Sequence, residues 1–141
     1  MELPTDWPTI GAMSARVAAK RFLETVASRD MDALAERIHP GATWRNVPEP
    51  AAEGRDEILA ILGAVLRVCS NTRWDLVSEA YEGDTAWLER VDRFWIAGRE
   101  LAVHCNGVFR FEAGTGRLLE VRDYADLHPW RTTLRQALNG V

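Results

Sequence analysis

A cation and an anion occupy the apolar face of one predicted strand. The run Trp87–Trp95, WLERVDRFW, alternates between polar and apolar residues as a half-buried strand does. On one of its faces, Arg90 and Asp92 lie between Leu88 and Phe94. Burying an unpaired charge costs several kcal/mol, so such a placement needs a partner or a purpose. The two side chains are therefore candidates to point into an apolar cavity.

Two further polar residues fall on apolar faces of predicted strands. In the run LLEVRDYADL, Asp123 shares its face with aliphatic residues only, namely Leu119, Val121, Ala125 and Leu127. In the short run ATWRNVP, Asn46 shares its face with Trp44. Because successive strand residues point to opposite sides, these polar groups are expected to face the same interior as Arg90 and Asp92.

An arginine between two aspartates offers a specific chemistry. Two close carboxylates cannot both ionise cheaply, and an apolar surrounding raises the pKa of the less stabilised one. A guanidinium fork can hold both groups in place. The pair then shares one proton and titrates as a unit, so one carboxyl can donate a proton while the other accepts one from water. This suits the addition of water to a strained epoxide, and it requires neither a metal nor a cofactor.

A structural interpretation of the same residues stays open. Arg90 with an aspartate on each side could also form an ion-pair network in the core or at a subunit interface, since structural networks perturb pKa values too. However, a buried salt bridge contributes little to stability. Two strands that each direct an acid toward an apolar interior therefore favour a functional role.

Three segments of the chain resemble the limonene-1,2-epoxide hydrolase family. They are RVD, LAVHCNGVFRF and EVRDYADL, and the resemblance extends from about Val17 to Trp130. That family has the cone-shaped fold of nuclear transport factor 2 and the SnoaL-like proteins. The resemblance implies that Asp92 is the general acid at the epoxide oxygen, that Asp123 is the base that deprotonates water, and that Arg90 bridges them.

The family motif that holds the water, Tyr-x-Asn on an early strand, is only partly present. Asn46 matches, whereas Trp44 stands where the tyrosine is expected. An indole has one N–H donor and no acceptor, whereas a phenol has both. Trp44 could donate to the water or fill the pocket and change the substrate's shape. The residues that match the family's apolar pocket, for which plain core packing is the alternative, are Phe94, Val103, Cys105 and Ala125.

The elements that must position these residues follow from the periodicity. Helices are predicted over 12–28, 31–39 and 54–69, with Asp30 as the N-cap of the second and Pro40 after its end. A short extended segment covers 41–48. Strands are predicted over 72–81, 85–97, 99–111 and 117–127, with a hairpin turn at 112–117 and a short helix from Pro129. The expected fold is α+β, with N-terminal helices closing an apolar pocket inside a cone-shaped, mixed and largely antiparallel sheet.

Length and composition predict one domain over residues 1–141, with a Pro-rich flexible tail up to about Thr9. A net charge of −4 argues against nucleic-acid binding. No secretory signal or membrane-spanning apolar run is seen, and Cys69 and Cys105 have no CxxC spacing, which favours a cytoplasmic protein with reduced thiols. The three histidines have no spacing typical of a metal site; they are His39, His104 and His128.

Three functions remain after these observations. The leading one is a cofactor-independent epoxide hydrolase that converts a small apolar epoxide and water into a vicinal diol. The second is an isomerase or cyclase of natural-product tailoring that uses the same carboxylates. The third is a non-catalytic ligand-binding or dimerisation module. The resemblance also implies a homodimer through the outer sheet face, where Trp87 and Trp95 are expected.

Overall fold

The computed structural model describes residues 13–139 and contains one six-stranded sheet. The strands follow the order β2-β1-β6-β5-β4-β3, and every neighbouring pair is antiparallel except β1 and β6, which are parallel. Their bounds are β1 Ile38–Val47, β2 Ala52–Glu53, β3 Asn71–Glu82, β4 Thr85–Ile96, β5 Arg99–Phe111 and β6 Leu118–Tyr124. The α+β class and the mixed, largely antiparallel sheet are confirmed.

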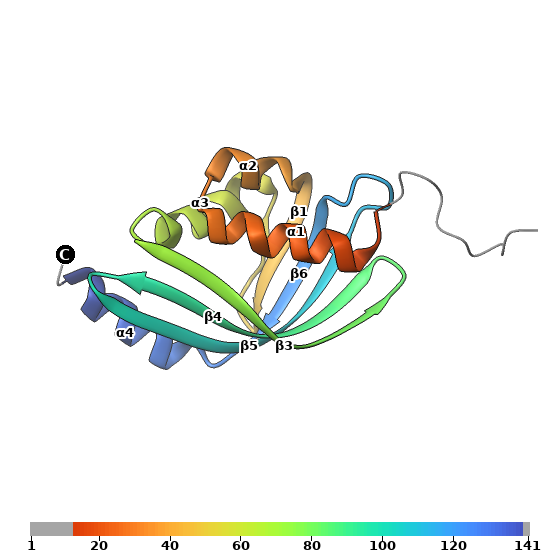
Figure 1. Ribbon diagram of the computed structural model, residues 1–141. Helices are drawn as coiled ribbons and strands as arrows, with labels where there is room; N and C mark the ends of the chain where they lie inside the picture. The colour runs from red at the N-terminus through yellow and green to blue at the C-terminus, as the bar shows by residue number, and fades with distance from the viewer. Residues whose placement is uncertain (1–12, 140–141) are drawn as a thin grey trace, which may run out of the picture.

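Helices α1, α2 and α3 lie over one face of the curved sheet (Figure 1). The four helices of the described residues are α1 Ala15–Ser28, α2 Met31–Glu36, α3 Arg55–Leu66 and α4 Leu127–Asn139. Asp30 caps α2 as predicted, because its side chain accepts hydrogen bonds from two backbone N–H groups of the first turn. The Ser14 hydroxyl caps α1 in the same way, through the Val17 N–H.

The alternation predicted for β4 is confirmed by its burial. Leu88, Arg90, Asp92 and Phe94 are all buried, while Trp87 and its outward neighbours are more exposed along most of the strand. The buried face of the sheet meets the apolar side of α1 through the ring of Phe22, which lies 6.1 Å from the ring of Trp44 on β1 and 6.0 Å from that of Phe109 on β5. The space between helices and sheet is therefore lined by the same strand faces that carry Arg90, Asp92 and Asp123.

Two boundaries near β1 differ from the prediction. Ile38 and His39 were expected at the end of a helix but belong to β1, which begins at a fully buried Ile38 paired with Leu118. Pairing with β6 outweighs the local helical pattern there. The two-residue strand β2, Ala52–Glu53, was not predicted, because two residues carry no periodic signal.

The end of β6 also differs from the prediction. The strand stops at Tyr124, and α4 begins at Leu127 instead of Pro129. The Asp126 side chain accepts a hydrogen bond from the His128 N–H at 3.1 Å, which starts the helix within the predicted strand. Leu127 is consequently a helical residue, and its expected place on the strand face was wrong.

A β-bulge corrects the expected faces at the start of β6. Phe111 pairs with Leu118 and Arg110 with Glu120, so Leu119 is an extra residue in the ladder. Leu118 is therefore the fully buried residue, and Leu119, which was expected to point inward, is half-buried. Beyond the bulge the expected faces are retained, with Val121 and Asp123 buried.

Two expectations from the sequence concern the termini and the membrane. The flexible tail expected up to about Thr9 lies outside the described residues. Among residues 13–139, no helix is both long enough and apolar enough to cross a bilayer.

Candidate active site

One guanidinium joins two carboxylates that come from different strands. Arg90 and Asp92 lie two residues apart on β4 and so point the same way, while Asp123 comes from β6. Arg90 donates from Nε to Asp92 Oδ1 at 2.9 Å and from Nη2 to Asp92 Oδ2 at 2.8 Å. It also donates from Nη1 to Asp123 Oδ1 at 3.0 Å and from Nη2 to Asp123 Oδ2 at 3.1 Å. Both contacts are bidentate, so each carboxylate has a fixed orientation.

Arg90, Asp92 and Asp123 are buried among aromatic side chains. Arg90 is 1% exposed, Asp92 5% and Asp123 7%. The rings of Trp74 and Phe109 each lie 5.1 Å from the guanidinium carbon of Arg90, within the range of a cation–π contact. Two carboxylates and one guanidinium leave an excess negative charge when all are ionised, and this buried setting favours its neutralisation by one proton.

The pKa directions of Asp92 and Arg90 follow from this setting. Burial raises the pKa of Asp92 and the charge of Asp123 adds to the effect, while the Arg90 guanidinium opposes it without cancelling it. Burial by itself would lower the pKa of Arg90, but the two aspartates outweigh it and raise that pKa well above its ordinary value. Asp92 is thus disposed to hold a proton beside a guanidinium that stays charged.

The two carboxylates open onto a cavity of about 240 Å³. Eight of the nine site residues predicted from the sequence line it: Trp44, Asn46, Asp92, Phe94, Val103, Cys105, Asp123 and Ala125. Arg90 is the exception. It had been expected to point into the cavity, but it is not among the lining residues and bonds to the two carboxylates that are. Its position fits the expected role of bridging Asp92 and Asp123.

The early strand brings Asn46 beside the proposed base. Asn46 pairs with Asp123, and Trp44 with Val121, in the parallel ladder between β1 and β6. The Trp44 ring is buried and packs at 6.2 Å from the ring of Trp74. The structure therefore places both residues of the incomplete Tyr-x-Asn motif on the cavity wall.

Several lining residues were missed by sequence reasoning. Trp74 follows the inward alternation of β3 after the buried Thr72, so the test used on β4 could have found it. The other missed residues come from two helices: Ile61, Leu62, Val65 and Leu66 from α3, and Leu127, Trp130, Arg131 and Leu134 from α4. Their place depends on how the helices dock. Trp130 packs against Phe94 with ring centroids 4.8 Å apart.

The lining is mostly apolar, with the amide of Asn46 on the same wall as the two carboxylates and Arg131 bonded to Glu49. Within the described chain, no three His, Cys, Asp or Glu side chains come together in a way that could hold a metal ion. An acid, a base and an amide beside an apolar volume can position water against an uncharged substrate and move one proton in each direction.

Comparison with known proteins places these features in a family. The family model for the SnoaL-like domain matches residues 19–121, which is most of the chain. A solved LEH-like epoxide hydrolase from M. tuberculosis has 21% identity and a TM-score of 0.71, over 88% of this chain and 91% of that one. A Shewanella denitrificans protein named as a SnoaL-like polyketide cyclase has 14% identity and a TM-score of 0.73, over 90% and 98%.

A third solved structure, of a protein from a soil-derived mobile gene cassette, has 24% identity and a TM-score of 0.66. The match covers 82% of this chain and 92% of that one. At these identities the three structures establish a shared fold, and one such fold carries several unrelated chemistries. The activity must therefore be argued from the site.

Proposed function

The chain belongs to the SnoaL-like domain family, and from the geometry of its site we propose that it is an epoxide hydrolase that needs no cofactor. Its substrate is a small apolar epoxide and its product a vicinal diol. The observation that carries the proposal is Arg90 held by Asp92 and Asp123, with both carboxylates at the wall of one apolar cavity. The M. tuberculosis neighbour named as an epoxide hydrolase supports it.

The proposed reaction is a single general acid–base step. Asp123, as the carboxylate, takes a proton from water while the water oxygen bonds to an epoxide carbon. The C–O bond of the ring breaks, and the epoxide oxygen takes the proton of Asp92, so that no free alkoxide forms. Asp92 ends ionised and Asp123 protonated, and proton exchange with solvent restores the starting state. Arg90 holds both groups throughout.

Asn46 and Trp44 have proposed roles beside this step. Asn46 neighbours Asp123 across the ladder, and its amide can hold the attacking water in line with the base. Trp44 limits the cavity next to it and narrows the range of substrates. Apolar contacts of the epoxide come from Phe94, Val103, Cys105 and Ala125.

The test uses a panel of cyclic and aryl epoxides in heavy-oxygen water. We expect a diol that carries one labelled oxygen, because the added hydroxyl comes from solvent. Asp92→Asn and Asp123→Asn should each lower the rate by about a thousandfold or more, which is within the range for loss of an acid or base. The exposed Asp56→Asn serves as the matched control and should keep full activity.

One result would overturn the proposal: no turnover of any epoxide by the wild-type protein, with the wild type and both variants folded and equally stable.

A cyclase or isomerase with the same carboxylates is the second candidate, favoured by Trp44, whose indole lacks the acceptor that a water-holding tyrosine would provide. Such an enzyme would convert its substrate without uptake of labelled oxygen.

A further inference from the structure

A buried thiol contacts the proposed acid. Cys105 lies on the inward face of β5, directly across the ladder from Arg90, and is 7% exposed. Its Sγ–H donates a hydrogen bond to Asp92 Oδ2 at 3.3 Å. Cys105 also lines the cavity, so the thiol, the carboxyl and any substrate meet at one wall.

The two oxygens of Asp92 are bonded unequally. Oδ2 accepts from Arg90 Nη2 and from the Cys105 thiol, which occupies both of its in-plane lone pairs. Within the described part of the chain, Oδ1 accepts only from Arg90 Nε. One acceptor position therefore remains, and it is on Oδ1.

We infer that Cys105 is a positioning residue whose thiol, by holding Oδ2 of Asp92, places the transferable proton on Oδ1. The inference rests on the proposed role of Asp92 as the acid. In this arrangement a single carboxyl oxygen carries the proton, so the donor has a fixed direction before the substrate arrives. A preset direction matters because proton transfer depends on alignment within a fraction of an ångström.

The thiol itself is suited to hold and not to react. Burial, reinforced by the charge of Asp92, raises the pKa of Cys105 well above its ordinary value. A protonated thiol is a donor and a poor nucleophile, so Cys105 can stand beside an epoxide without being alkylated by it.

The inference predicts how substitutions change the acid. A hydrogen bond to the ionised carboxyl stabilises that form, so its removal in Cys105→Ala should raise the pKa of Asp92 by about half a unit to one unit. Cys105→Ser keeps a donor and should reverse the rise. Val103→Ala is the matched control, since Val103 also lies on the inward face of β5, pairs with Asp92 and lines the cavity, but donates nothing from its side chain.

The measurement is a carbon-13 NMR titration of aspartate carboxyl groups in the four proteins without substrate, with the Asp92 signal assigned by its loss in Asp92→Asn. An unchanged Asp92 titration in Cys105→Ala, or an equal rise in Val103→Ala, would overturn the inference. Because no substrate is present, this result does not depend on hydrolysis, whereas failure of the proposed function would appear as absent diol.

Steady-state kinetics test which oxygen of Asp92 donates the proton. If Oδ1 is the donating oxygen, kcat of Cys105→Ala should fall by about tenfold at a pH where Asp92 is protonated, and Cys105→Ser should recover most of it. Cys69→Ala is the kinetic control and should leave kcat nearly unchanged, because Cys69 is also a buried thiol but donates to the Val65 carbonyl and not to Asp92. Equal losses of kcat in Cys105→Ala and Cys69→Ala would indicate a packing role alone and contradict the inference.

Discussion

At the scale of single residues, Arg90 keeps its proton at all times, whereas Asp92 can gain and lose one. Arg90 is a fixed cation because both carboxylates bond to it, and Asp92 has a raised pKa because it is buried beside another acid. A buried ion network adds little to the stability of the fold, since apolar residues of similar volume stabilise a core as well or better. The placement at a cavity wall gives the charges an alternative purpose.

The raised pKa of Asp92 predicts a pH-dependent stability. The folded state binds the Asp92 proton more tightly than the unfolded chain, in which the pKa of this carboxyl is about 3.8. This contribution is therefore complete below pH 3.8 and is lost as the pH rises through the folded pKa. Relative to Asp92→Asn, the wild type should lose about 1.4 kcal/mol for each pH unit that separates the folded pKa from the unfolded one.

The check is denaturant unfolding of both proteins from about pH 4 to about pH 9. The difference between their free energies of unfolding, and not either value alone, isolates Asp92 from the other titrating groups. A wild type that gained stability over Asp92→Asn with rising pH would show that the folded pKa is lowered instead of raised.

At the scale of secondary structure, β5 positions the acids without supplying one. Gly107 lies opposite Asp123 in the β5–β6 ladder. A Cβ at this position would stand 2.2 Å from Asp123 Oδ1 and 2.7 Å from Arg90 Nη1. Real Cβ atoms essentially never approach so closely, so a side chain at residue 107 would force the bridge between β4 and β6 to shift.

Gly107→Ala should therefore displace the Arg90–Asp123 pair. We expect a loss of stability of about 1–3 kcal/mol from overpacking and a fall of kcat by about a hundredfold from misplacement of the base. Gly41→Ala in β1 is the control, because its Cβ would make only an ordinary contact, 3.5 Å from His39 Nδ1. Thermal unfolding and single-turnover rates measure the two effects. Full activity in Gly107→Ala would mean that the pair is not required in this position.

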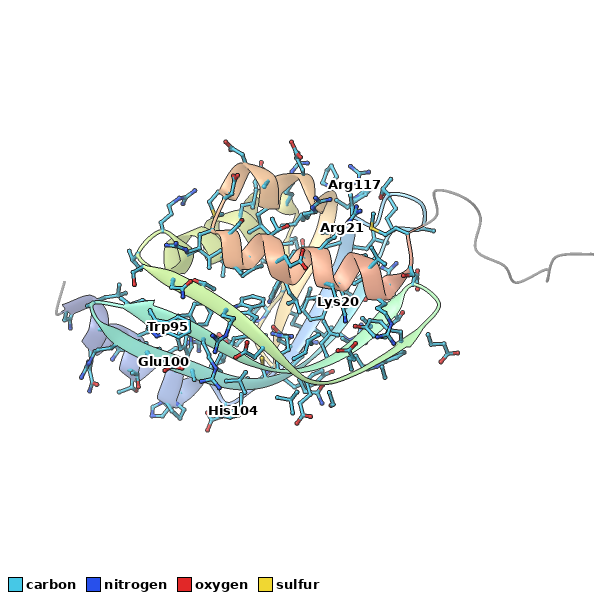
Figure 2. The ribbon with its side chains drawn as sticks, in the orientation of Figure 1. Lys20, Arg21, Trp95, Glu100, His104 and Arg117 are labelled. Carbon is cyan, nitrogen blue, oxygen red and sulfur yellow. The ribbon has the colours of Figure 1, made fainter. Side chains whose placement is uncertain are left out.

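At the scale of the whole molecule, the sheet has a second, outer face. Figure 2 shows His104 pointing from this face, away from helices α1 to α3. Large apolar residues are exposed on it: Val77 is 61% exposed, Trp87 40% and Tyr124 50%. A hollow of about 430 Å³ is lined by Val77, His104 and Tyr124 among others. Exposed apolar residues that cluster on one face are typical of a contact surface.

We propose that a second copy of the chain covers this outer face and forms a homodimer. Charged residues of both signs lie among the apolar ones, with Glu89 on β4 and Arg122 on β6, so two copies of this face can make complementary contacts across a two-fold axis. Light scattering should give about twice the chain mass of 15.9 kDa. Trp87→Glu should yield the monomer, while Val17→Glu, an equally exposed site on α1, should not. A monomeric wild type would refute the dimer.

The local alternation of the chain was enough to find the acids and their faces. In a strand, the direction of a side chain is set by its position in a two-residue period, which needs no knowledge of what lies beside it. For this reason Arg90, Asp92 and Asp123 could be assigned to one interior from the residues alone. The helix cap at Asp30 was predictable for a similar reason, because its bonds reach only two and three residues ahead.

Other features depended on partners distant in the chain. Leu118 is buried because a bulge forms where β6 meets β5, and Ile38 is extended because β6 pairs with it, although its own neighbours favoured a helix. The cavity walls from α3 and α4 depend on helix docking. The shared guanidinium needed β4 and β6 to lie on either side of β5 at one register, with a glycine between them. Periodicity sets which way a side chain points, whereas strand pairing and packing set which side chains it meets.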